Sequence, residues 1–279
     1  MSNTLELSAR LGAMSGRVHG FIYFAPEATE EYDACGLPAA AHYFASRGAA
    51  LGEVTAEVVT ATFYNFNPEL ITPVIPMAWS LAEPSSIQAA RMRAAGRVLR
   101  RVDPLLSEAE RDEATQIAAA MVDGVGDAGR PLAAANRAVV APSDSWEHLW
   151  QLVTVIREWR GDGHVAALIA APADPVEALV LHAATGQVPK KALVATRRWP
   201  VADWEAAAER LRNRGLLDLD DEFTEAGRAF RDDIEHRTNV AAAPLVDAVG
   251  PGQTQRLIDL LRPISQALLD HNAFRAIRP

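Results

Sequence analysis

Two arginines, an aspartate and a histidine fall within one short segment, REWRGDGH, at residues 157–164. On a helix, Arg157, Arg160 and His164 are three, four and seven positions apart and share one face. The two glycines of the segment remove side chains beside that face, so a ligand or another backbone can approach closely. Guanidinium groups in such a place suit a carboxylate, sulfate or phosphate. We therefore expect Arg157, Arg160 and Asp162 to bind an anionic substrate in an enclosed polar cavity.

His164 is a candidate general base or acid, because imidazole changes its charge near neutral pH. Residues 42–61 align without a gap on residues 164–183, and one histidine, two valines and four alanines match. If this is an internal repeat whose copies pack with pseudo-twofold symmetry, His42 and His164 face a common interior and can act together in catalysis. The alternative is chance similarity between two alanine-rich helical hairpins, with both histidines packed in the core and both arginines paired with acidic side chains.

A second unusual segment is FYNFNPEL, at residues 63–70. Asn67 is a good helix N-cap and Pro68 suits the first helical position. Capping does not explain Tyr64 or Asn65, so we expect their polar groups to line the substrate pocket.

Glu57 lies on the helix expected just before this segment. A buried carboxyl group there has a raised pKa and is a third candidate catalytic base. A solvated carboxylate, or one paired with an arginine, has no such role.

Several kinds of chemistry lack their sequence signatures. There is no GxGxxG segment after a strand, no GxxxxGK[ST] and no GxSxG, which excludes dinucleotide, P-loop and serine-hydrolase sites. Neither HxxxH nor HExxH occurs, and the single cysteine, Cys35, excludes an internal disulfide and a cysteine-pair zinc site. We expect no metal and no cofactor, so any catalysis would be acid–base work such as elimination, isomerisation or ring closure.

The residues that carry these groups must be positioned by helices. Alanine is abundant and aromatic residues make up only 6% of the chain, which favours close-packed helices over sheets. Amphipathic spacing predicts helices over 83–101 and 107–123, the second opening with a capping box. Turn residues at 141–148 predict a boundary between an N-terminal helical half, 1–141, and a C-terminal half, 142–279. Ser143, Asp144 or Ser145 is placed to cap the helix that follows.

The C-terminal half contains clear helix boundaries. Gly215 is placed to end one helix and Thr224 to cap the next, with two very short strands expected around Asp220 and Asp221. The segment RLRNRGLLDLDDEFTEAGRAFRDDIEHRT resembles the winged helix of MarR-like regulators, over roughly residues 174–270. This resemblance implies two helix-turn-helix or winged-helix-like halves in a mostly α fold.

The whole chain is also similar to an actinobacterial family of helical proteins. The shared segments are YFAPEA at 23–28, EVVTATFYNFNP at 57–68, GRPLAAAN at 129–136 and REWRGDGHVAAL at 157–168. That resemblance implies a two-part helical fold related to winged helices, and it carries over no general activity.

Binding to DNA is not expected from the charges. The expected recognition helix, 200–214, begins with Asp203 and Glu205, where a DNA reader presents arginine, lysine or asparagine. The formal charge of 27 − 36 = −9 also lacks the broad positive field that attracts phosphates. The opposing evidence is a local basic cluster of Lys190, Lys191, Arg197 and Arg198.

These observations lead to one function and one alternative. The first is binding or acid–base conversion of a small anionic metabolite, such as one of secondary metabolism, in a pocket between the halves. The alternative is a ligand-responsive MarR-like transcription regulator. The sequence has no stretch of 18 apolar residues and no signal-like start, so we expect a cytoplasmic protein without membrane contact, acting alone or as a homodimer or heteromer.

Overall fold

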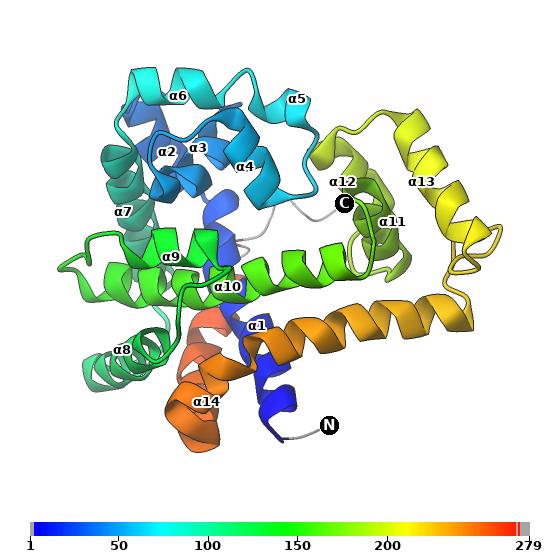
Figure 1. The fold of residues 1–279 in the computed structure, drawn as a ribbon. Coiled ribbons are helices and arrows are strands. Elements are labelled where there is room, and N and C mark those ends of the chain that lie inside the picture. Colours follow the sequence, from blue (N-terminus) through cyan, green and yellow to red (C-terminus); the bar gives the residue numbers. More distant parts are fainter. Residues whose placement is uncertain (1–2, 272, 274–279) are drawn as a thin grey trace.

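The protein is built from α-helices (Figure 1). The computed structural model describes residues 3–271 and residue 273. In that part of the chain the extended pairing is a single β-bridge between Leu217 and Phe223. The mostly α fold is therefore confirmed. The two very short strands expected around Asp220 and Asp221 are reduced to that bridge, which closes a tight turn in which the backbone N–H of Asp221 bonds the carbonyl of Asp218.

The chain contains runs of short helices between a few long ones. The first part contains α1 (Asn3–Gly20), η1 (Phe21–Tyr23), α2 (Pro26–Ala34), α3 (His42–Gly48), η2 (Ala49–Leu51), α4 (Ala56–Phe63), α5 (Pro68–Ile71), α6 (Ile75–Leu81), α7 (Pro84–Val102), α8 (Glu108–Asp123) and α9 (Pro131–Arg137). The second part contains α10 (Ser145–Ala170), α11 (Pro175–Ala184), α12 (Lys190–Arg197), α13 (Val201–Asn213) and α14 (Glu225–Asp270).

Two hydrophobic clusters form the interior. The larger one takes in α1 to α9, the first part of α10 as far as Trp159, and the last part of α14 from Leu245. The smaller one runs from Ala167 to Ile234 and contains α11, α12 and α13. Helices α10 and α14 lie side by side and belong to both clusters (Figure 1). The clusters therefore divide inside these two helices, whereas a domain boundary after residue 141 stays a prediction.

Local capping signals set the helix boundaries as the sequence predicts. Ser107 and Glu110 form the capping box of α8, and the Asp144 side chain accepts the first N–H groups of α10. Gly215 has a φ of 71°, which a helix-ending glycine adopts without strain. Thr224 caps α14. Each of these signals acts within four residues, which is why it is legible in the sequence.

Helix α14 bends sharply at one residue. Gly250 has φ 79° and ψ 163°, so the two parts of the helix run in different directions around it. The bend returns the second part onto α1 and α8, with which it packs closely. Helix α9 was not expected, because its segment follows a glycine-rich loop.

The proposed internal repeat agrees with the helix order at its start. His42 begins α3 and His164 lies inside α10, and each is followed by two further helices in the aligned positions. Beyond these helices, a shift of two residues aligns Trp79 with Trp199. The agreement ends there, because Trp79 lies within α6 whereas Trp199 lies in the turn after α12. A duplication therefore stays a prediction.

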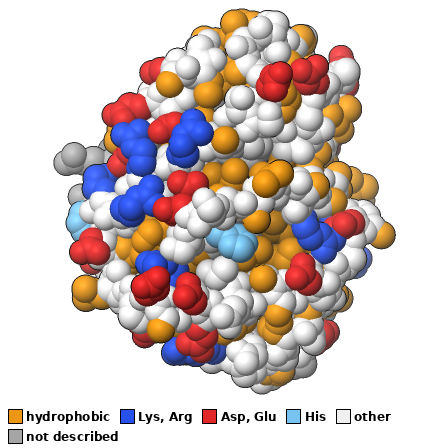
Figure 2. Space-filling view, turned by 90° about the vertical axis from the view of Figure 1, so that its left-hand side faces the viewer, with side chains coloured by type: hydrophobic (Ala, Val, Ile, Leu, Met, Phe, Trp, Pro, Cys, Tyr) orange, Lys and Arg blue, Asp and Glu red, His pale blue; other side chains and the backbone are white. Residues whose placement is uncertain are grey.

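Charged side chains on the surface are interspersed. The face in Figure 2 shows lysine and arginine next to aspartate and glutamate. Helix α7 supplies arginines that pair with glutamates of α2, namely Arg93 with Glu31, Arg97 with Glu30 and Glu31, and Arg101 with Glu27.

Among the described residues, no single helix is long and apolar enough to cross a membrane. Helices α10 and α11 meet the length and composition test only together, as a pair bent by 104°.

Candidate functional site

Two adjoining cavities lie where the two hydrophobic clusters meet. The larger has a volume of about 610 Å³ and is enclosed by α1, α10, α11, α12 and α14. The smaller has a volume of about 140 Å³ and lies between α3, α4 and α10. The residues that line both are Asn65, His164, Leu168 and Arg197. These shared walls make the two cavities one candidate site.

His164 is held in one tautomer by a threonine. Its Nδ1 atom lies 2.9 Å from Oγ1 of Thr238. Oγ1 of Thr238 also lies 2.8 Å from the carbonyl of Ile234, which can only accept, so both contacts are hydrogen bonds when the hydroxyl donates to Ile234 and accepts from His164. Nδ1 therefore carries the proton, and Nε2 is left with a free lone pair. No hydrogen bond to Nε2 is found in the described part of the chain.

The charge of His164 is set by its surroundings. Burial, together with the nearby groups Arg231, Arg160 and His182, lowers its pKa to about 4, against an opposing effect of Glu235. The ring is therefore neutral at pH 7.

His182, on α11, lines the larger cavity together with His164. Burial lowers its pKa, as do the charges of Arg231 and Arg197. Sequence reasoning missed this residue, since a lone histidine on an alanine-rich helix carries no local signal.

Arg197 is the cavity cation without a carboxylate partner. Its Nε donates to Oδ1 of Asn65 at 3.3 Å, and its guanidinium lies 4.1 Å from the centre of the Phe66 ring. No ion pair to Arg197 is found within residues 3–271 and 273, and burial lowers its pKa. Nη1 donates to Oγ1 of Thr196 at 3.0 Å, and no hydrogen bond from Nη2 is found among the described residues. This half-buried guanidinium therefore keeps donors that suit an anion. The sequence reading placed this residue in a basic surface cluster instead.

Arg157, Arg160 and His164 form a stripe along one face of α10, and its two arginines already have protein partners. Arg160 pairs with Oε2 of Glu235 at 3.0 Å and with Oδ1 of Asn239 at 3.2 Å. Arg157 pairs with the neighbouring Glu158 at 2.5 Å. This is the structural pairing that the sequence left open as the alternative. Arg160 still lines the larger cavity and Arg157 the smaller one.

The glycines of the stripe serve protein arginines. A Cβ atom at Gly163 would collide with the guanidinium of Arg130, which donates to the carbonyls of Trp159 and Ala241. In the same way, Gly12 leaves room for Arg160. At Gly163 the expected close approach of a ligand is thus replaced by a packed side chain, whereas Gly161 lines the smaller cavity.

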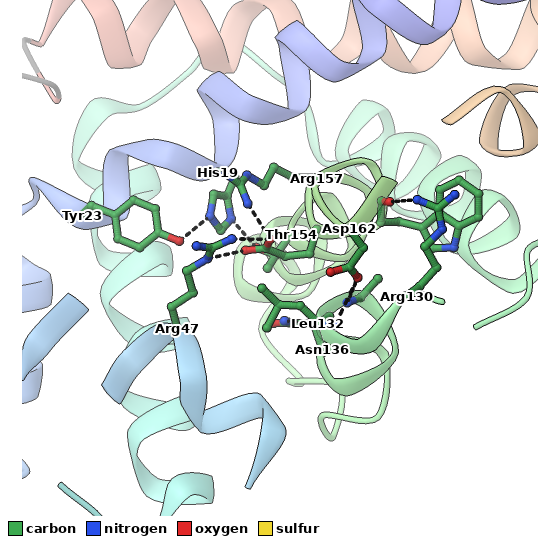
Figure 3. Close-up of polar contacts among 12 residues, drawn as sticks. His19, Tyr23, Arg47, Arg130, Leu132, Asn136, Thr154, Arg157 and Asp162 are labelled. Carbon is green, nitrogen blue, oxygen red and sulfur yellow. Dashed lines mark hydrogen bonds and ion pairs between the residues drawn. The ribbon is translucent and has the colours of Figure 1, made fainter. Parts of the chain in front are cut away.

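Asp162 anchors the start of α9 (Figure 3). Its Oδ2 accepts the backbone N–H groups of Leu132 and Ala133 at 3.1 and 3.0 Å. Burial and the charge of Glu158 raise its pKa to about 6, while the two N–H groups and Arg47 act in the opposite direction. Asp162 lines the smaller cavity, with one oxygen committed to this helix.

A closed polar network lies beside the smaller cavity (Figure 3). Glu158 accepts from Nε and Nη2 of Arg47 at 3.0 and 2.9 Å. Burial acts to raise the pKa of Glu158, but Arg157 and Arg47 outweigh it and hold that pKa well below its usual range. Sequence reasoning missed Arg47 and gave Glu158 no partner, because they are 111 positions apart.

The network continues to a second histidine, His19, which is fully buried. Its Nδ1 bonds Oγ1 of Thr154 at 3.0 Å and its Nε2 bonds the Tyr23 hydroxyl at 2.8 Å. Tyr23 in turn accepts from Arg91 at 3.0 Å. Burial lowers the pKa of His19 well below its usual value, with the charge of Arg91 adding to the effect.

The FYNFNPEL segment joins the two clusters. Tyr64 donates to the carbonyl of Ala173, and the carbonyl of Asn65 accepts from the Trp199 indole at 3.0 Å. Asn67 caps α5, as expected, and also donates to the carbonyl of Arg198 at 2.9 Å. Tyr64 lines the smaller cavity and Asn65 lines both. Tyr64 also fastens the turn after α10, and Asn65 and Asn67 fasten the end of α12, to the first part of the chain.

Two candidate catalytic residues lie elsewhere. Nε2 of His42 is 3.0 Å from the carbonyl of Leu37 and 3.2 Å from Asp33, and His42 lines neither cavity. The expectation that His42 and His164 face a common interior is therefore wrong. Glu57 is exposed, and a hydrogen bond from Thr55 lowers its pKa. Glu57 therefore lacks the burial and the raised pKa that we expected of a catalytic base.

The expected recognition helix, α13, uses its arginines internally. Arg210 pairs with Asp174 and Glu177, and Arg212 pairs with Asp221. Helix α13 packs its apolar side against the smaller cluster through Trp204.

Other regions of the described chain offer fewer polar groups for binding or catalysis. A groove of about 750 Å³ lies between α7 and the loop after α9, and alanine, valine and proline dominate its lining. In residues 3–271 and 273, no group of three or more histidine, cysteine, aspartate or glutamate side chains is arranged to hold a metal ion.

The order of short helices, the bridged turn and the long helix α14 define a protein of the helix-turn-helix class. The chain belongs to a helix-turn-helix family, whose family model matches residues 8–275. No curated protein and no solved structure matches the chain.

Proposed function

We propose that this protein binds a small anionic metabolite in the two joined cavities. The observation that carries the proposal is Arg197, a half-buried cation without a carboxylate partner that lines both cavities. A guanidinium binds carboxylates and phosphates with parallel hydrogen bonds. The larger cavity, at about 610 Å³, has a volume typical of small-molecule sites.

The apolar part of the lining suits a ligand with a hydrocarbon portion. Leu168, Leu179, Leu181 and Ile234 line the larger cavity together with the charged groups. Such a mixture of apolar walls and a few polar anchors is typical of metabolite sites.

A conversion of this ligand would be cofactor-free proton transfer, such as elimination, isomerisation or ring closure. Neutral His164 would accept a proton at Nε2, and Arg197 would hold the anionic group. The lowered pKa of His164 keeps the ring in the neutral form that can accept a proton.

The experiment compares two adjacent arginines. Phenylacetate is titrated into the wild-type protein, Arg197→Met and Arg198→Met, and binding is measured by calorimetry and by the shift in melting temperature. Arg198 is an exposed neighbour and serves as the matched control. We expect binding by wild type and Arg198→Met and loss of binding by Arg197→Met. Equal binding by all three proteins contradicts the proposal.

A second candidate function is a ligand-responsive, MarR-like transcription regulator. The family match and the order α11, α12, α13, bridged turn favour it. The arginine pairs of α13 oppose it, since those guanidinium groups are already neutralised by acidic side chains. A mobility-shift assay with DNA upstream of the gene, at about 100 mM salt, separates the two. We expect weak, non-specific binding, whereas specific nanomolar binding favours the regulator.

A further inference from the structure

The free nitrogen of His164 limits which anions suit the site. Nδ1 donates to Thr238, and Thr238 donates to Ile234, so Nε2 is a hydrogen-bond acceptor. This direction is the one in which both short contacts of the Thr238 hydroxyl are hydrogen bonds, because its single proton can serve only one of them. A ligand group at Nε2 must therefore be a donor.

The surrounding charges select a neutral donor. Arg160 and Arg231 are close enough to lower the pKa of His164, and Arg197 lines the same cavities. An ammonium group would be repelled by these cations, although Glu235 offsets part of that effect. A hydroxyl group donates without adding charge.

We infer that the ligand is a hydroxy acid whose acid group binds Arg197 and whose hydroxyl donates to Nε2 of His164. This inference rests on the proposed function and specifies its ligand class. Leucine side chains of the larger cavity leave room for an aryl or alkyl portion.

The test uses three acids of similar size. Mandelate has a hydroxyl donor, phenylacetate has no group at that position, and phenylglyoxylate has a carbonyl acceptor. Dissociation constants are measured by calorimetry for wild type, His164→Phe, Thr238→Val and Thr154→Val. The last variant makes the same substitution at the other histidine–threonine pair, of which neither residue lines the cavities, and is the matched control.

Mandelate should bind wild type roughly 3–10-fold more tightly than either other acid, as one net hydrogen bond predicts. The advantage should disappear in His164→Phe and shrink in Thr238→Val, where the ring is free to change tautomer. It should persist in Thr154→Val. Nitrogen-15 NMR of the ligand-free wild type should report a proton on Nδ1 of His164.

The failures are distinguishable. If all three acids bind equally and depend on Arg197, the hydroxy-acid inference is overturned and the proposed function stands. If NMR finds the proton on Nε2, the inference is overturned whatever the ligand. If wild type binds none of the acids, the proposed function and the inference fail together.

Discussion

Two histidines in this protein share one local arrangement and differ in what completes it. Nδ1 of His19 bonds Thr154 at 3.0 Å, and Nδ1 of His164 bonds Thr238 at 2.9 Å. Each threonine is fully buried and donates its own proton to a carbonyl four residues earlier on its helix. In both cases Nε2 is therefore the acceptor.

The difference lies at Nε2. Tyr23 donates to Nε2 of His19, and Arg91 donates to Tyr23, so both ring nitrogens of His19 are used. Nε2 of His164 faces the candidate site without a partner in the described chain. The histidine–threonine pair is thus structural at His19, where Tyr23 occupies Nε2. It is available for ligand binding at His164, where no described side chain occupies Nε2.

The ion pairs of the two regions differ in the same way. The side chains of Arg47 and Glu158 are 10% and 1% exposed, whereas those of Arg160 and Glu235 are 23% and 36% exposed. Water can compensate a lost partner in the second pair but not in the first.

The largest effect is expected from neutralising the buried carboxylate. Glu158→Gln leaves the charge of Arg47 buried and should lower the free energy of unfolding by about 3–5 kcal/mol. Glu235→Gln, in the open region, should cost less than about 1 kcal/mol. Urea denaturation of both variants measures the two values. Equal costs would show that the regions do not differ in their electrostatics.

The histidines themselves provide a matched pair. His19→Phe leaves the Tyr23 hydroxyl buried without its acceptor and should destabilise by about 2–3 kcal/mol. His164→Phe should change stability by less than about 1 kcal/mol, because Thr238 keeps its bond to Ile234. A larger loss in His164→Phe than in His19→Phe would reverse the assignment of structural and binding roles. The measurement is again the free energy of unfolding, at pH 7.

The smallest effect is a dependence on pH. The pKa of His164 is about 4 in the folded protein and near 6.5 when unfolded, so the unfolded state binds more protons between these values. Stability from the neutral ring is complete above pH 6.5 and is lost as the pH falls toward 4. Between pH 6.5 and 4.5, wild type should lose about 1–2 kcal/mol more than His164→Phe.

Asp162 acts with the opposite sign, because its pKa is raised to about 6. Its stabilising effect is complete below pH 4 and is lost as the pH rises through 6. The effect of Asp162 is present in both wild type and His164→Phe, so it cancels in the difference between their stabilities. An NMR titration of His164 with a midpoint near 6.5 would contradict the prediction.

The sequence by itself determined the helical class and many helix ends. The capping box at Ser107 and the caps at Asp144 and Thr224 could be predicted because each bond closes within four residues. It also placed Arg160 and His164 on one face, since helical periodicity fixes that geometry.

Only the tertiary structure decided what those side chains meet. Glu235 and Thr238 reach the stripe from α14, about seventy-five positions along the chain. Arg197 enters the site from α12, and the segment around Asn65 brings it there. Spacing along one helix states which residues share a face, but it does not state which other helix covers that face. That depends on how distant apolar surfaces pack together, which here separated His42 from His164 and brought Arg197 to it.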